Sequence, residues 1–230
     1  MQLRSFFSCL SLLCLAGFVL PSCSPKEATF YSRSGENPPP STLSLQELID
    51  KTPDGGTVSV PKAKFVLKQG LLVANRKNIR IECAPGSQIL VDDISADVIE
   101  IVDSKGISIS GAFLRHLNPL KKYECHGDVV KLRNASEVTI ENSELDGCGA
   151  IGLSAWGSSN ITVQNCLIAH NSFNALYIDG CATVRIKDNV IENNANLIQS
   201  YRSDDIEMSG NVIRNNGGYW DTPGKAGLKK

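Results

Sequence analysis

Val138-Thr139-Ile140-Glu141-Asn142-Ser143-Glu144-Leu145 is one copy of an eight-residue pattern that recurs along this chain of 230 residues. Aliphatic residues or Met occupy the first, third and eighth positions of the pattern, and a small residue or Asn occupies the sixth. Successive copies start 31, 23, 23 and 22 residues apart, at Ile107, Val138, Ile161, Val184 and Ile206. A regular period of this length is the sequence signature of a solenoid, in which each repeat forms one coil.

A second short strand is predicted upstream of each copy. Apolar residues alternate with others there, as a half-buried strand requires. The first residue of this strand precedes the copy by eight residues in four cases and by ten in the third; the strands are Ile99 to Ile101, Val130 to Leu132, Ile151 to Leu153, Leu176 to Ile178 and Ile198 to Ser200. Strands this short, joined by Asn, Gly, Ser and Asp, must hydrogen-bond to the coils above and below them.

The predicted fold is therefore all-β: a single-stranded right-handed parallel β-helix of about seven coils. Ser44 and Glu47 are spaced as a capping box, which predicts a short helix that closes the N-terminal end of the stack. No segment of ten or more residues with helical periodicity separates the predicted strands, which argues against a doubly wound α/β fold.

The N-terminus has the layout of an export signal: Arg4, an apolar stretch over residues 6–20, and then Leu20-Pro21-Ser22-Cys23. It resembles the bacterial lipoprotein signal, in which a cysteine is lipidated and becomes the new N-terminus. This resemblance implies a membrane anchor at Cys23 and an outer-membrane or cell-surface location, with the periplasmic face as an alternative. Pro21 departs from the usual pattern, so cleavage without a lipid is a second alternative.

The chain is predicted to divide into a signal peptide at 1–22, a flexible tether at 23–42, the β-helix at 43–216 and a C-terminal tail at 217–230. The tail has no recognisable cap, so a protein partner at the C-terminal end of the stack is an open alternative. A net charge of −1 without a basic run argues against a nucleic-acid partner.

Two cysteines fall in the same turn of adjacent coils, Cys125 and Cys148. A disulfide between them is geometrically allowed, because neighbouring strands lie about 4.8 Å apart and disulfides tolerate Cα separations of about 5.5 Å. The sequence lacks a CxxC motif and any His/Cys spacing typical of metal ligands. Neither a metal site nor a cofactor is predicted.

Residues 43–216 resemble the pectin-lyase-like superfamily of right-handed parallel β-helices. The similarity rests on the repeats, on residues 45–61, where a capping segment leads through Pro53-Asp54-Gly55 into the first strand, and on residues 73–79, which look like the first full coil. The superfamily contains polysaccharide lyases, hydrolases, epimerases and adhesins, so the resemblance is specific for fold and much less so for function. It implies a face that binds polysaccharide.

In the polygalacturonase-like branch of this superfamily, catalytic acids lie just before, and substrate-binding cations within, the strand upstream of the pattern. At the matching positions stand Asp97 and Asp128 before the strand and Lys131 and Arg133 within it. The predicted outward columns are Glu100, Lys131, Gly152, Tyr177 and Gln199, and then Val102, Arg133, Ser154, Asp179 and Tyr201. Two stacked carboxylates with separated pKa values can serve as acid and base.

Three functional hypotheses follow. The first is a non-catalytic protein in which a groove of Glu100, Lys131, Arg133, Tyr177 and Tyr201 binds an acidic glycan. The predicted substrate-binding residues are Asp97, Glu100, Tyr177 and Tyr201. The second is a uronate lyase or epimerase with Asp128, His126, Lys131 and Arg133 as catalytic residues, because a base beside the bound sugar can abstract the C5 proton. The third is a structural or adhesive envelope protein, for which Asp97 and Asp128 are ordinary turn residues and Glu100 pairs with Lys131 across strands.

Overall fold

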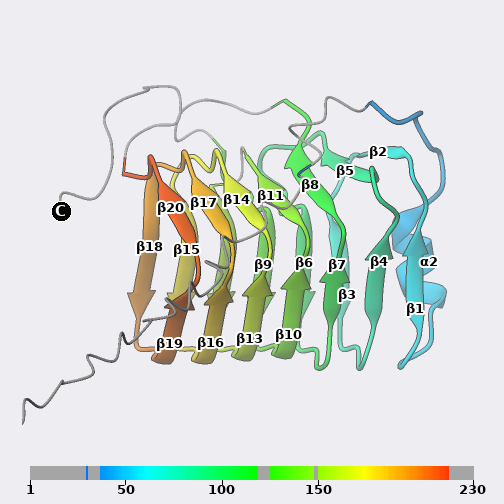
Figure 1. The fold of residues 1–230 in the computed structure, drawn as a ribbon. Coiled ribbons are helices and arrows are strands. Elements are labelled where there is room, and N and C mark those ends of the chain that lie inside the picture. The colour runs from blue at the N-terminus through cyan, green and yellow to red at the C-terminus, as the bar shows by residue number, and fades with distance from the viewer. Residues whose placement is uncertain (1–29, 31–36, 119–124, 148–149, 218–230) are drawn as a thin grey trace, which may run out of the picture.

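The computed structural model describes Phe30 and residues 37–118, 125–147 and 150–217. These residues form a parallel β-solenoid of about seven coils with one short helix at its N-terminal end (Figure 1). The predicted signal peptide, Cys23, Cys148 and the tail after Gly217 lie outside the described residues, so the predictions made for them stay predictions. Within the described ranges, no helix has the length and hydrophobicity that a membrane span requires.

Three parallel sheets run along the solenoid, and each coil contributes one strand to each sheet, except that the last coil, with β19 and β20, has no strand of sheet C within the described residues. Sheet B contains the starts of the pattern copies and consists of β1 (Thr57–Val60), β4 (Arg80–Cys83), β7 (Ser108–Ser110), β10 (Ser136–Glu141), β13 (Ser159–Gln164), β16 (Ala182–Lys187) and β19 (Asp204–Ser209). Sheet A contains the eighth pattern position and consists of β2 (Lys64–Leu67), β5 (Gln88–Val91), β8 (Phe113–His116), β11 (Glu144–Asp146), β14 (Leu167–Ala169), β17 (Val190–Glu192) and β20 (Val212–Arg214). Sheet C contains the upstream strands and consists of β3 (Leu71–Ala74), β6 (Ile99–Val102), β9 (Val130–Arg133), β12 (Ile151–Trp156), β15 (Asn174–Asp179) and β18 (Asn196–Tyr201).

One apolar core fills the solenoid, and the repeated pattern positions form it. Ile109 and Ile140 of sheet B, Leu114 of sheet A and Leu132 of sheet C are fully buried. The last coil is less covered, since Ile213 remains 37% exposed. The sequence-based prediction of the fold is therefore confirmed, whereas a partner at the C-terminal end stays a prediction.

The register of β12 corrects one sequence-based prediction. Leu153, rather than Ile151, pairs with Val130, and Ser154 pairs with Lys131. β12 is six residues long, and its first residue, Ile151, lies two residues before the one that pairs with Val130. The sequence-based alignment placed Ile151 opposite Val130 instead. In the observed register, the spacing of eight residues to the next pattern copy, at Ile161, holds in this coil as well.

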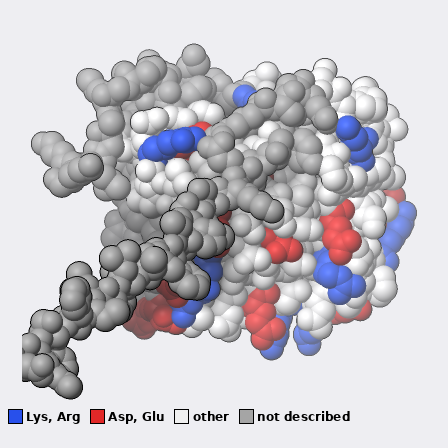
Figure 2. Space-filling view, viewed as in Figure 1, with Lys and Arg blue, Asp and Glu red and all other residues white. Residues whose placement is uncertain are grey.

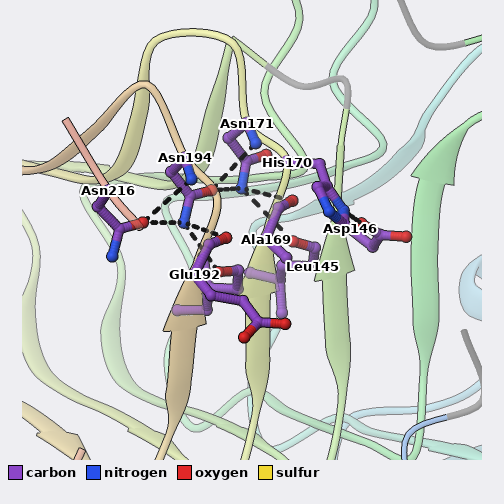
Figure 3. A network of polar contacts seen from close by, with 9 residues as sticks. Leu145, Asp146, Ala169, His170, Asn171, Glu192, Asn194 and Asn216 are labelled. Atoms are coloured by element: carbon purple, nitrogen blue, oxygen red, sulfur yellow. Dashed lines mark hydrogen bonds and ion pairs between the residues drawn. The ribbon is translucent and has the colours of Figure 1, made fainter. Parts of the chain in front are cut away.

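Asparagine ladders fix the turns between sheets. At the sixth pattern position, the amide of Asn189 donates to Asn211 Oδ1 at 3.0 Å. A second ladder, in the turns from sheet A to sheet C, joins Asn171, Asn194 and Asn216, with amide bonds of 2.8 and 2.9 Å (Figure 3). Each amide side chain bonds to its copy in the next coil, so the turns stack in register.

The N-terminal end is closed by helix α2 (Leu45–Lys51), as predicted. Ser44 Oγ accepts a hydrogen bond from the Glu47 N–H at 3.3 Å, and Leu45 and Ile49 are buried against the first coil. The Gln46 side chain accepts from the Leu72 N–H at 2.8 Å and donates to the Leu72 carbonyl at 2.9 Å. Because β3 is the edge strand of sheet C, this amide satisfies backbone groups that another strand would otherwise pair.

The described part of the predicted tether lies against the β-helix. Phe30 is 5% exposed and packs on Leu167 and Ala169 of β14. Near its other end, the Ser41 N–H donates to the Lys64 carbonyl of β2 at 2.9 Å. At these two points the segment is therefore fixed to sheet A.

Candidate functional site

The outward side of sheet C presents two columns of side chains, which we call the sheet C face. The first column consists of Leu72, Glu100, Lys131, Ser154, Tyr177 and Gln199. The second consists of Ala74, Val102, Arg133, Trp156, Asp179 and Tyr201. Ser154 and Trp156 replace the Gly152 and Ser154 that the sequence placed in these columns, as a result of the register of β12.

Three aromatic side chains stack across successive coils of this face. The ring centroids of Trp156 and Tyr177 are 5.3 Å apart, and those of Tyr177 and Tyr201 are 5.8 Å apart. Lys131 Nζ lies over the Trp156 ring, 5.5 Å from its centroid, in a cation–π contact. Tyr201 ends the stack and is 51% exposed. Tyr177 lies in the first column of the face, and Trp156 and Tyr201 lie in the second, so the three rings form one stack that crosses between the columns. We call this stack the aromatic column; it contains the predicted binding residues Tyr177 and Tyr201.

Within the described residues, both cations of the sheet C face, and Arg202 beside it, are paired with carboxylates. Lys131 Nζ lies 3.1 Å from Asp97, and an Arg133 guanidinium nitrogen lies 2.7 Å from Glu100. Arg202, in the turn after β18, lies 2.7 Å from Asp179, and this contact lowers the pKa of the Asp179 carboxyl. Glu100 is opposite Lys131 in the register, but the expected pair between them is not the one formed. Each long side chain reaches instead to a diagonal partner.

The two carboxylates predicted to stack, Asp97 and Asp128, do adjoin each other. Asp97 Oδ1 accepts a hydrogen bond from the Asp128 N–H at 2.7 Å. Asp128 is only 4% exposed, and its carboxyl accepts from Ser154 Oγ at 2.5 Å. Burial raises the pKa of Asp128 to about 6, assisted by the charge of Asp97 and opposed by the Ser154 hydrogen bond and Lys131. Asp128 therefore titrates in the range useful for general acid–base chemistry, although its side chain is enclosed.

This carboxyl makes stability depend on pH. Because the folded-state pKa of Asp128 lies above the unfolded value of 3.8, its bound proton stabilises the fold, and that stabilisation is lost as the pH rises through about 6. We expect Asp128→Asn to raise the free energy of unfolding at about pH 8 by roughly 1–3 kcal/mol and to flatten its decline from about pH 4. Urea unfolding at both pH values measures this. Asp188→Asn, at an exposed aspartate, is the control, and an unchanged pH profile in Asp128→Asn contradicts the prediction.

The family model of the right-handed β-helix region matches residues 64–225. The chain belongs to the right-handed β-helix family. A search of curated protein sequences found no significant match.

Solved structures share this β-helix at low sequence identity. A crystal structure of a glycosyl hydrolase candidate from Parabacteroides merdae is 13% identical, with a TM-score of 0.59; the match covers 74% of this chain and 88% of that one. The ORF18 protein of Geobacillus virus E2 is 17% identical, with a TM-score of 0.56, over 76% of this chain and 36% of that one. At these identities the likeness shows the fold alone.

The histidines of the β-helix lie apart from the sheet C face contacts. His126 is exposed, and among the described residues its side chain has no hydrogen bond or ion pair with Asp128, Lys131 or Arg133. His116 is fully buried with Nε2 2.8 Å from the Ala96 carbonyl oxygen, and burial lowers its pKa. The structure thus brings Asp97, Asp128, Lys131, Ser154 and Trp156 together and does not add His126 to them; Lys121, Lys122 and Tyr123 lie outside the described residues.

A second polar cluster lies in the turns that lead from sheet A to sheet C (Figure 3). His170 Nδ1 is 2.5 Å from Asp146 Oδ1, and the Asp146 side chain is 8% exposed while that of His170 is 38% exposed. Gly147 allows this approach, because a Cβ there would lie 2.3 Å from the His170 carbonyl oxygen. Sequence reasoning did not find this pair, since its members are 24 residues apart on neighbouring coils.

The cysteines follow two patterns. Cys125 is disulfide-bonded, whereas Cys83, Cys166 and Cys181 are free and buried. Pairing of Cys125 with Cys148 stays a prediction because Cys148 lies outside the described residues. Burial raises the pKa of the Cys166 thiol to about 12, so this residue is a small core side chain rather than a nucleophile. The described ranges contain no cluster of His, Cys, Asp or Glu able to hold a metal ion.

Proposed function

We propose that this protein binds polysaccharide through the sheet C face. The observation that supports it is the aromatic column of Trp156, Tyr177 and Tyr201, whose last ring is half exposed. A sugar ring has an apolar C–H face and a rim of hydroxyls, which suits an aromatic surface bordered by polar side chains. Tyr201 is the outermost platform, and the ion pairs beside it offer donors and acceptors to hydroxyl groups.

Glycan affinity of the full chain tests this function. Across a panel of polysaccharides, we expect Tyr201→Ala and Tyr177→Ala each to weaken the tightest interaction by about tenfold or more, corresponding to about 1.4 kcal/mol. Affinity electrophoresis measures the effect. Val66→Ala, which removes a side chain 44% exposed on sheet A, should leave affinity unchanged. Binding that survives both tyrosine variants would mean that the glycan binds outside the sheet C face. Absence of binding to every polysaccharide would favour the structural or adhesive hypothesis.

A second candidate function is a uronate lyase or epimerase, favoured by the pKa of about 6 at Asp128 beside Lys131. A lyase produces unsaturated uronates, which absorb in the ultraviolet. Incubation with alginate, pectate, chondroitin and heparan chains should then give an absorbance rise that Asp128→Asn and Lys131→Ala abolish. Constant absorbance with all four polymers would contradict a lyase acting on them. Glycan binding and epimerisation, the latter monitored by NMR, would then be the functions to test.

Export and lipid attachment are part of the same proposal. A domain that displays a glycan-binding face at the cell envelope needs an anchor, and the signal-like segment ending at Cys23 supplies a candidate. Cells fed labelled palmitate should label the wild-type chain and not Cys23→Ser. Equal labelling of both would exclude Cys23 as the site.

A further inference from the structure

We propose that the glycan recognised by the sheet C face is uncharged, in contrast to the acidic glycan that the family resemblance suggests. This inference rests on the proposed function, because it concerns the ligand of the same face. It follows from how the charges of that face are arranged, and it assigns a substrate class that the fold alone does not.

The charges of the sheet C face cancel within the protein. Among the described residues, the columns of this face contain two cations and Arg202 borders them, and each of the three has its own carboxylate at 2.7 to 3.1 Å, in the pairs Lys131–Asp97, Arg133–Glu100 and Arg202–Asp179. The cationic side chains of these pairs are 27%, 51% and 80% exposed. Even the exposed guanidinium of Arg202 therefore has its charge compensated. Asp128, beneath this surface, can add negative charge and never positive charge.

A uronate would have to break one of these pairs or bind beside the carboxylate that already belongs to it. Release of Lys131 costs its contact with Asp97 and its position over the Trp156 ring. The incoming carboxylate would then lie near Asp97 and Glu100, and like charges at such distances repel. Arg133 presents the same conflict, because Glu100 already occupies one edge of its guanidinium. The protein's own carboxylates thus already contact the cationic groups that a polyanion would bind.

Uncharged sugars meet no such conflict. Paired carboxylate and guanidinium groups remain able to accept from and donate to hydroxyls, since each keeps lone pairs or N–H groups beyond the ion pair. Among the described residues of the two columns, the other polar groups at the surface are neutral: the Tyr177 and Tyr201 hydroxyls and the Gln199 amide, whose Oε1 accepts from Asn174 at 3.0 Å. A ring stacked on Tyr201 lies among these groups without displacing an ion.

A matched pair of polymers tests the inference on the full chain. Polygalacturonate and its fully methyl-esterified form share a backbone and differ in charge; cellohexaose and mannan extend the neutral side, and alginate extends the anionic side. We expect the tightest ligand to be neutral, each polyanion to bind at least about tenfold more weakly, and neutral affinity to stay constant from about 50 to about 500 mM NaCl. A polyanion as the tightest ligand, with affinity falling in salt, overturns the inference and leaves the proposed function standing. Retention of no glycan of either kind overturns both.

A charge-releasing variant supplies an independent test. Glu100→Gln combined with Asp179→Asn frees Arg133 and Arg202, and we expect polygalacturonate affinity to rise by about tenfold or more and to become salt-dependent. The matched control combines Asp205→Asn with Glu207→Gln, which frees Arg185 on sheet B with the same change in net charge. Equal gains in both variants, or none in the first, contradict the idea that carboxylates of the sheet C face exclude anionic ligands.

Discussion

Asn194→Ala is expected to lower the free energy of unfolding by about 3–5 kcal/mol, because two or more buried polar groups lose their partners at about 1–3 kcal/mol each. Asn194 is fully buried in the middle of the second asparagine ladder (Figure 3). Its Oδ1 accepts from the Asn171 N–H at 3.0 Å and from the Asn171 amide at 2.8 Å. Its own amide donates to the Ile168 carbonyl at 2.9 Å and to Asn216 Oδ1 at 2.9 Å. Alanine leaves the Asn171 N–H and the Ile168 carbonyl buried without these bonds.

Urea unfolding followed by circular dichroism measures this loss. Asn196→Ala is the matched control, because Asn196 lies in the same coil and makes one bond, from its amide to the Phe173 carbonyl, at a half-exposed position. We expect the control to cost about 1 kcal/mol or less. Similar unfolding midpoints for the two variants would show that the ladder contributes no more than an ordinary surface amide.

The fold was predictable because a solenoid repeats its physical requirements at a fixed period. Each coil must place an apolar residue at the same inward position, so five copies of the pattern determine five of the seven strands of sheet B and the strands of sheet A that follow them. The second ladder has the same kind of signal: Asn171, Asn194 and Asn216 each stand ten residues after a pattern start. The eight-residue pattern does not reach this position, so the ladder was not among the sequence-based predictions.

The candidate site was predictable only in part. The positions of Lys131, Arg133, Tyr177 and Tyr201 follow from the repeat, whereas Trp156 was left out of the predicted columns because β12 was aligned by Ile151 rather than by Leu153. The partners of the cations were not predictable. A lysine or arginine on a sheet reaches a neighbour directly opposite or a diagonal one, and the choice depends on side-chain conformations that a repeat period does not encode.

Gly70→Ala is expected to destabilise the protein by about 3 kcal/mol or more and to disturb the sheet C face at the same time. Gly70 precedes β3 and lies directly against the next coil: a Cβ there would be 1.7 Å from the Asp97 carbonyl oxygen and 2.9 Å from its carbon. Both contacts are with backbone, so no side-chain rotation relieves them. The next coil must shift at Asp97, the residue that pairs with Lys131 and accepts from the Asp128 N–H.

Gly180→Ala separates this steric effect from the general cost of replacing glycine. Gly180 has a φ of +63°, and a Cβ there would meet no atom closer than 3.8 Å, so only the left-handed backbone penalty of about 1–2 kcal/mol applies. Urea unfolding of the two variants should therefore differ by more than 1 kcal/mol, by this estimate of the penalty. Gly70→Ala should also weaken glycan binding under conditions where it stays folded, because the displaced Asp97 no longer holds Lys131 over Trp156. Wild-type stability of Gly70→Ala would contradict the prediction. It would mean that the first two coils can move apart at no cost, although the Leu71 N–H donates to the Val98 carbonyl across them at 2.9 Å.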